Sequence, residues 1–190
     1  VTAHDGSPLY ALVLDLDGTV HRIGGEEHNY VARAWSRDSQ WLYLLTDRAG
    51  SLQTWRCRPD GSDMTCLLTS DTRVAGEMPG GRELILVQRN NHELRLRSLD
   101  DGTERPILHT EPTRRWIGHR MQGDRMLFID RTDNENRLCR VDLSDWSIEI
   151  LASVPGEEVL LFSTRPDGSR ILYQKEEHTG SDLVLLEGLN

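Results

Sequence analysis

The segment "QWLYLL" (residues 40–45) recurs along the chain as "RELILV" (82–87), "DRMLFI" (124–129) and "SRILYQ" (169–174). Superposing the four copies puts four apolar residues in one column, at intervals of 42, 42 and 45 residues: Leu42, Leu84, Met126 and Ile171. The next residue is apolar in every copy as well, so the segments have no polar face. Such a pattern is typical of strands that are buried on both sides.

Each copy is flanked by the same kinds of short segment. The segment upstream has a column of small residues, which favours an innermost strand where space is short: Ala34, Gly76, Gly118 and Ser163. A polar connection and a mixed strand follow, with hairpin spacing. A turn and a last short strand complete each unit, and three of these turns contain a glycine that can adopt a positive φ: Gly18, Gly61 and Gly102.

Each unit is therefore expected to form four antiparallel strands in about forty residues, which is the length of a propeller blade. A β-sandwich would not explain a repeat of near-constant length. We predict an all-β fold, a β-propeller of four-stranded antiparallel blades, with about four to five blades represented. The chain is expected to be one propeller domain or a fragment of a larger propeller, with these units: 8–23 (partial), 30–69, 72–109, 114–152 and 158–187 (partial).

The composition argues against several classes of function. The 31 acidic and 22 basic residues give a net charge of −9 and are scattered, so no basic face is available for direct nucleic-acid binding by this segment. The longest apolar runs, such as 159–162 and 183–186, are far too short to span a membrane. Three cysteines without a C-x-x-C pair indicate neither a disulfide scaffold nor a structural zinc site.

Two long segments resemble the TolB-like repeat, in which S-P-D-G precedes a buried strand and S-D-R-x-G follows it. They are "WSRDSQWLYLLTDRAGSLQTWRCRPDGSDMTCLLT" (35–69) and "STRPDGSRILYQKEEHTGSDLVLLEG" (163–188). Ser39 stands where the repeat has glycine, and "MPGGRE" and "MQGDRM" keep only part of the pattern. The resemblance covers nearly the whole chain and implies a fold rather than a function.

Three segments also look like the C-terminal propeller of CadC/ToxR-like bacterial regulators: 51–61, 114–130 and 180–190. That resemblance implies a sensor propeller in the periplasm, preceded by a winged-helix DNA-binding domain and often by a membrane anchor. The cytoplasm is the alternative compartment. The partner would be a protein or a small ligand, and a homodimer is a further expectation, because the strands at the ends of an arc have open edges.

We expect a non-catalytic binding or sensor propeller without a cofactor. The chain has no G-x-S-x-G nucleophile elbow, and its seven histidines form neither H-x-H nor H-E-x-x-H. Other TolB-like proteins leave alternatives from other classes open. These are an oligogalacturonate lyase, a propeller associated with a peptidase domain, and a TolB-like scaffold for envelope assembly.

Three residues on predicted innermost strands are candidates for ligand binding in the channel: Arg73, Arg115 and His119. The arginines of "TRRWIGHR" (113–120) could hold an acidic ligand by bidentate contacts, or could be solvated or form salt bridges between blades. His119 could face the channel beside Arg115, or could be an ordinary hydrogen-bonded histidine. No catalytic residue and no metal site are assigned.

The two cysteines of one predicted hairpin are candidates for a disulfide. If the hairpin closes symmetrically about Gly61 and Ser62, Cys57 and Cys66 lie directly opposite each other, close enough for a strained, reducible bond. A one-residue bulge would remove that pairing. Cys139 is expected to be a free, half-buried thiol.

Two acidic segments resemble calcium loops only superficially: "DLDGT" (15–19) and "DRTDNEN" (130–136). Neither has the full D-x-D-x-D-G pattern with a distal glutamate, whereas Asp-Gly is typical of hairpin turns. We therefore predict turns at both places.

Overall fold

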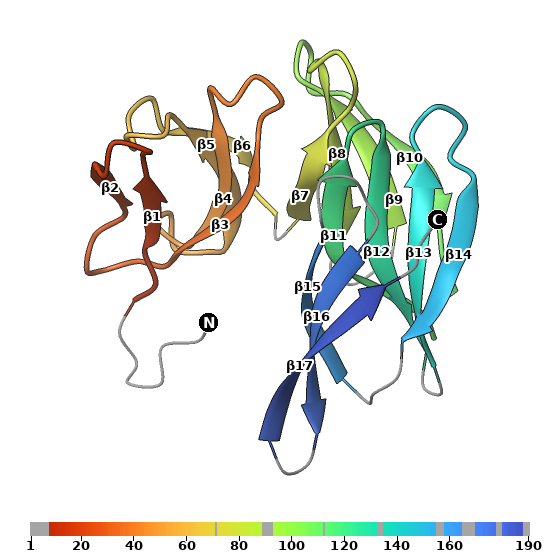
Figure 1. Ribbon diagram of the computed structural model, residues 1–190. Coiled ribbons are helices and arrows are strands. Elements are labelled where there is room, and N and C mark those ends of the chain that lie inside the picture. The colour runs from red at the N-terminus through yellow and green to blue at the C-terminus, as the bar shows by residue number, and fades with distance from the viewer. Residues whose placement is uncertain are drawn as a thin grey trace. The chain divides into compact units, whose positions relative to one another are not determined.

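The computed structural model describes residues 8–70, 72–88, 93–111, 113–132, 135–154, 158–164, 170–177 and 180–187. All regular elements in these residues are β-strands, arranged in sheets of neighbouring strands (Figure 1). Nothing in this part of the chain forms an apolar helix of the length that a membrane span needs. The predicted all-β fold of four-stranded antiparallel sheets is confirmed, and the chain is a partial β-propeller.

The chain divides into two compact units. The first contains residues 1–90 and 94–106, and the second contains residues 91–93 and 107–190. The boundary between Pro106 and Ile107 lies inside the strand of residues 104–109. The expectation of a single propeller domain stays a prediction.

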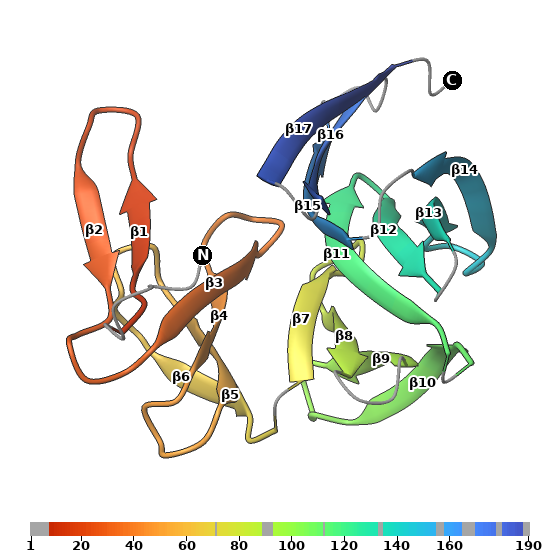
Figure 2. The ribbon, with the colours of Figure 1, turned by 90° about the horizontal axis from the view of Figure 1, so that it is seen from below.

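The first unit begins with a two-stranded antiparallel sheet and continues with two four-stranded sheets (Figures 1 and 2). The two-stranded sheet consists of β1 (Ala11–Leu14) and β2 (Val20–Ile23). The next contains β3 (Tyr30–Trp35), β4 (Leu42–Thr46), β5 (Gln53–Cys57) and β6 (Thr65–Leu68). The third contains β7 (Thr72–Glu77), β8 (Glu83–Gln88), β9 (Glu93–Ser98) and β10 (Glu104–His109).

The second unit contains a four-stranded and a three-stranded antiparallel sheet. The four-stranded sheet is made of β11 (Arg115–Gln122), β12 (Arg125–Arg131), β13 (Asn136–Asp142) and β14 (Ile148–Val154). The three-stranded sheet is made of β15 (Glu158–Thr164), β16 (Arg170–Glu177) and β17 (Gly180–Glu187). In both units the strands of a sheet follow one another in chain order, as in a meander.

The second strand of each four-stranded sheet is buried on both faces. Every residue of β4 is buried, and so are the central residues of β8 and β12. In the first unit, Leu42 and Leu44 pack with β1 and β2, while Tyr43 packs with β7 and β8. Burying a leucine or isoleucine side chain stabilises the fold by about 1.5–3 kcal/mol, so these strands hold neighbouring sheets together.

A β-bulge interrupts the first strand of each four-stranded sheet and of the three-stranded sheet. The pairing shifts between Ala32 and Ala34 in β3, between Val74 and Gly76 in β7, and again within β11 and β15. Ala34 and Gly76 directly follow the extra residue, so the column of small residues marks the bulge in these strands. Bulges bend a strand and increase its twist.

The turns confirm the predicted glycine positions. In the β1–β2 turn the amide of Gly18 donates to Asp15 O at 2.9 Å, and in the β5–β6 turn the amide of Gly61 donates to Arg58 O at 2.9 Å. Their φ angles are 91° and 85°. The β13–β14 turn has no glycine, and Trp146 adopts a φ of 62° there. A side chain in this region costs about 1–2 kcal/mol, which the flanking strands must offset.

A buried tyrosine links two sheets of the first unit. Tyr43 Oη on β4 donates to Glu77 Oε1 on β7, and the amide of Arg37 donates to the other carboxylate oxygen at 2.8 Å. Burial and this hydrogen bond raise the pKa of the Tyr43 phenol well above its usual range. The hydroxyl of Thr54 likewise donates to the carbonyl of Thr72. Polar side chains therefore reinforce the apolar contact between adjacent sheets.

This link predicts a loss of stability in alkali. The folded protein holds the Tyr43 proton more tightly than the unfolded chain, in which tyrosine ionises near pH 10. The stabilisation is therefore complete below about pH 10 and declines as the pH rises further. In urea unfolding between about pH 9 and 11.5, Tyr43→Phe should show a shallower decline than the parent. Identical slopes for the two proteins would contradict the assignment.

Candidate functional site

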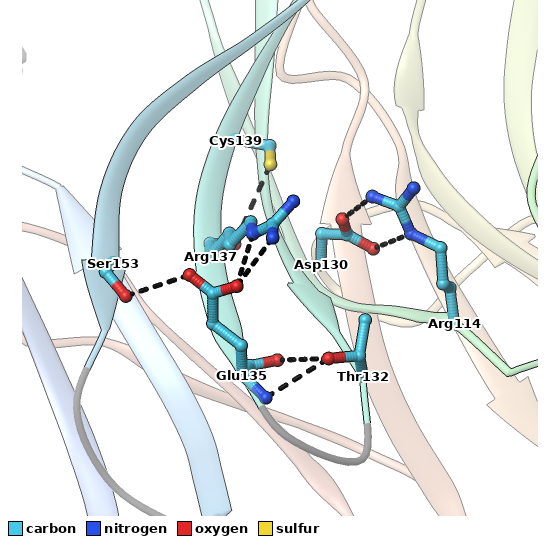
Figure 3. Close-up of polar contacts among 7 residues, drawn as sticks. All are labelled: Arg114, Asp130, Thr132, Glu135, Arg137, Cys139 and Ser153. Atoms are coloured by element: carbon cyan, nitrogen blue, oxygen red, sulfur yellow. Dashed lines mark hydrogen bonds and ion pairs between the residues drawn. The ribbon is translucent and has the colours of Figure 1, made fainter.

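A polar cluster in the second unit surrounds the end of β12 (Figure 3). Asp130 is fully buried and receives a two-pronged contact from Arg114, which lies just before β11. Arg114 Nε donates to Asp130 Oδ1 at 3.1 Å, and a second nitrogen donates to Oδ2. The hydrogen bond to Asp130 raises the pKa of Arg114. This pair ties the entry of β11 to β12 and leaves Asp130 with its charge compensated.

A second ion pair lies at the turn between β12 and β13. Arg137 Nε donates to Glu135 Oε2 at 2.7 Å, and Ser153 on β14 donates to the other oxygen at 3.1 Å. The hydrogen bond from Arg137 lowers the pKa of Glu135. The amide of Thr132 donates to Glu135 O at 2.8 Å and closes the turn. Glu135 therefore links Arg137 to Ser153 on β14.

Cys139 lies on β13 next to the second ion pair, with its thiol 3.8 Å from Arg137 O (Figure 3). It is fully buried rather than half-buried, which corrects the sequence expectation. Burial, and next the charge of Asp130, raise the pKa of its thiol to about 12. Only a thiolate is a strong nucleophile or metal ligand. At neutral pH Cys139 is therefore a packing residue.

The predicted ligand-binding residues lie on the first strands of their sheets. Arg73 is on β7 of the first unit and is partly buried. Arg115 is exposed on β11 of the second unit, opposite Arg131. A shared site for Arg73, Arg115 and His119 stays a prediction.

His119 is half-buried at the bulge of β11. Its ring stacks on Phe128, with centroids 6.2 Å apart and planes 21° from parallel. Trp116 packs against the same phenyl ring, with centroids 5.2 Å apart. Gly118, with a φ of 65°, allows the chain to bend there. The described contacts of His119 are those of an aromatic packing residue.

The expected pairing of Cys57 with Cys66 is wrong. The register places Cys66 opposite Trp55, and Cys57 faces Leu42 on its other side. The turn is centred on Asp60, where the amide of Arg58 donates to Ser62 O at 2.9 Å, and not between Gly61 and Ser62, so the partner of Cys66 lies two residues before Cys57. All three cysteines are free thiols. Burial raises the pKa of Cys57 to about 11.

The acidic turns bind their own backbone. In "DLDGT", Asp17 accepts a hydrogen bond from the amide of Thr19 at 2.8 Å, which confirms a turn. Hydrogen bonds from serine and threonine side chains and from backbone amides lower the pKa of six carboxyls, all at or near turns: Asp17, Asp38, Asp60, Asp101, Asp142 and Asp145. Residues 133 and 134 of "DRTDNEN" lie outside the described residues. Within the described part of the chain, no three His, Cys, Asp or Glu side chains converge as a metal site.

Sequence reasoning missed two buried pairs, Tyr43–Glu77 and Arg114–Asp130. The salt bridge that the structure shows in "TRRWIGHR" joins Arg114 to Asp130 within one sheet, so a salt bridge between blades is not confirmed for Arg114 and stays untested for Arg115. A signal for Asp130 existed, because it directly follows the apolar run "MLFI" and so lies on a buried strand. Glu77 likewise ends a strand that is largely buried.

Comparison with solved structures shows what the fold resembles. TolB from Acinetobacter baumannii superposes with a TM-score of 0.70 at 14% identity, over 93% of this chain and 45% of the other. An oligogalacturonate lyase in complex with manganese gives 0.61 at 16%, over 96% and 58%. A nidogen/laminin complex gives 0.62 at 13%, over 97% and 79%. The chain thus spans less than half the length of this TolB.

These similarities show the fold alone, because every identity is below 20%. No protein-family model and no curated protein sequence matches the chain. The class defined so far is therefore a partial β-propeller similar in fold to TolB. Proteins with different names share this fold, so the fold alone does not define one activity.

The two ion pairs near β12 should differ in their effect on stability. Arg114→Ala leaves the buried Asp130 without its partner, so we expect a loss of about 2–3 kcal/mol, below the range for a fully buried pair. Arg137→Ala is the matched control, because both members of its pair are partly exposed, and it should change the free energy of unfolding little. Equal losses in urea unfolding would contradict this account.

The cysteines should differ in accessibility. In the native protein at pH 8, a thiol reagent is expected to modify Cys66, while Cys57 and Cys139 react only after unfolding, since both are buried with raised pKa values. Peptide mass spectrometry identifies the modified site. Mild oxidation should leave Cys57 and Cys66 unlinked. Recovery of a Cys57–Cys66 disulfide from the folded protein would overturn the observed register.

Proposed function

We propose that this chain is a non-catalytic binding propeller, the recognition part of a bacterial signalling or transcription regulatory protein. The supporting observation is the use of its polar side chains. Asp130 and Glu77 tie strands or sheets together, and six further aspartates bind turn amides. The two buried thiols have raised pKa values. Side chains that fix a scaffold in this way suit a rigid binding module.

In this proposal the exposed turns and the first strands present the binding surface. Arg115, exposed on β11, would contact an acidic group of the ligand or partner. Binding would change the orientation or association of the propeller and so act on an upstream winged-helix DNA-binding domain. The resemblance of residues 51–61 and 114–130 to sensor propellers supports this role. In this proposal the module would lie in the periplasm if a membrane anchor precedes it.

A polysaccharide lyase is the second candidate, and the similarity to an oligogalacturonate lyase favours it. An envelope scaffold, favoured by the similarity to TolB, would also be non-catalytic. A peptidase-associated propeller is favoured by the similarity to a puromycin hydrolase, with a TM-score of 0.54. These candidates differ in whether the full polypeptide has an effector domain, and in whether it cleaves a polymer.

The test uses the full polypeptide encoded at the native locus. The proposal expects an upstream domain that retards DNA from its own promoter region in a gel shift. It also expects that Arg115→Glu changes the transcriptional response without changing DNA affinity. An upstream region that consists only of further blades would contradict the regulatory role. Formation of unsaturated product from polygalacturonate with added Mn²⁺ would replace it with the lyase.

A further inference from the structure

The two-stranded sheet of the first unit has one apolar face that is exposed. Leu14 on β1 lies opposite Val20 on β2, and Leu12 and Tyr10 continue the same face. Their exposed fractions are 69%, 56%, 58% and 49%. Arg22 lies opposite Leu12 on this face, and its guanidinium is 4.2 Å from the centroid of the Tyr10 ring. We call Tyr10, Leu12, Leu14 and Val20 the exposed apolar face.

The repeat supplies an internal comparison for this face. The β1–β2 and β5–β6 turns have the same hydrogen bonds: Asp15 N donates to Thr19 O at 2.8 Å, and Arg58 N donates to Ser62 O at 2.9 Å. Asp15 therefore corresponds to Arg58, and Leu14 corresponds to Cys57. In the same way, Leu12 corresponds to Trp55. β1 and β2 are thus the third and fourth strands of a blade.

The residues equivalent to Leu14 are covered in the later sheets. Cys57 is 0% exposed, and it packs against Ala11, Val13 and Ile23 of the preceding sheet. Val141, at the same position in β13, is also 0% exposed, and the side chain of Arg97 in β9 is 24% exposed. Leu14 is the exception, because it is exposed. At the equivalent position in the next sheet, the preceding sheet covers Cys57.

The free edge of β1 leads to the same conclusion. Among the described residues β1 pairs only with β2, whereas its equivalent β5 pairs with both β4 and β6. An open strand edge presents unpaired amide and carbonyl groups that can accept another strand. The edge of β1 therefore fits a strand equivalent to β4, and the exposed apolar face fits a further sheet.

We propose that the exposed apolar face is a blade interface, and that its occupant is a four-stranded blade formed by the segment of the same polypeptide N-terminal to Val1. The occupant would present small and branched aliphatic residues, as Ala11, Val13 and Ile23 do toward Cys57. The same upstream segment would supply the two inner strands that pair with the edge of β1. This inference does not depend on the proposed function.

The size of the face favours an occupant from the same polypeptide over a second copy. The four side chains expose on the order of 400 Å², about half of the 800 Å² that each partner of a standard interface contributes. A covalently linked blade needs less area, because the linkage supplies a high effective concentration. The chain also spans only 45% of the A. baumannii TolB chain, so propellers of this fold can contain much more chain.

The test compares thiol labelling in two polypeptides, residues 1–190 and the longer native polypeptide. In the shorter one, Leu14→Cys and the turn control Leu16→Cys should react with a maleimide at similar rates. In the longer one, Leu14→Cys should react at least about tenfold more slowly, because labelling would require the blades to separate. Leu16→Cys, which is fully exposed, should keep its rate. Site-resolved mass spectrometry separates these thiols from the native cysteines.

Equal labelling of Leu14→Cys in both polypeptides would overturn the proposal. Protection in residues 1–190 that grows with protein concentration would also overturn it, since a second copy would then be the occupant. Leu14→Asp gives an independent readout. It should lower the urea midpoint of the longer polypeptide and leave that of residues 1–190 unchanged, whereas Val13→Asp, on the buried face, should lower both.

Discussion

The fold depends on the second strand of each sheet, which must bury both of its faces. A strand such as β4, with five consecutive buried residues, cannot be stable in an isolated sheet, because both faces of such a sheet would be exposed to solvent. In the first unit, β1 and β2 cover one face of β4, and β7 and β8 cover the other. Repetition of the unit follows from this requirement, since within each unit a sheet completes the core of the one before it.

The same constraint determines where polar side chains lie. Between tightly packed sheets a buried carboxylate must have a partner, and Glu77 and Asp130 each have one. At the exposed turns, aspartates bind backbone amides instead. Most of the recognisable polar chemistry in the described residues thus belongs to the scaffold. This distribution supports the proposed binding module, whose specificity would come from exposed loops and strand ends.

The repeat could be predicted from the sequence because its signal is local and recurs four times. Leu42 and Leu84 belong to one column, and the column of Ala34 and Gly76 marks the bulge of the first strands. Contacts between sheets could not be predicted. Tyr43 and Glu77 are separated by 34 positions, and nothing in their local sequence links them. The register of Cys66 depends on the centre of the turn, which lies at Asp60 and not between Gly61 and Ser62 as the sequence suggested. The candidate ligand residues Arg73 and Arg115 could be placed on first strands, but a common ligand for them has no sequence signal.

Amide hydrogen exchange followed along the chain tests the central claim most directly. If each second strand is buried on both faces, the slowest amides should recur in β4, β8 and β12, about 42 residues apart, while the outer strands β6 and β10 exchange faster. Slow exchange confined to a single sheet, or slow exchange without this recurrence, would contradict the account.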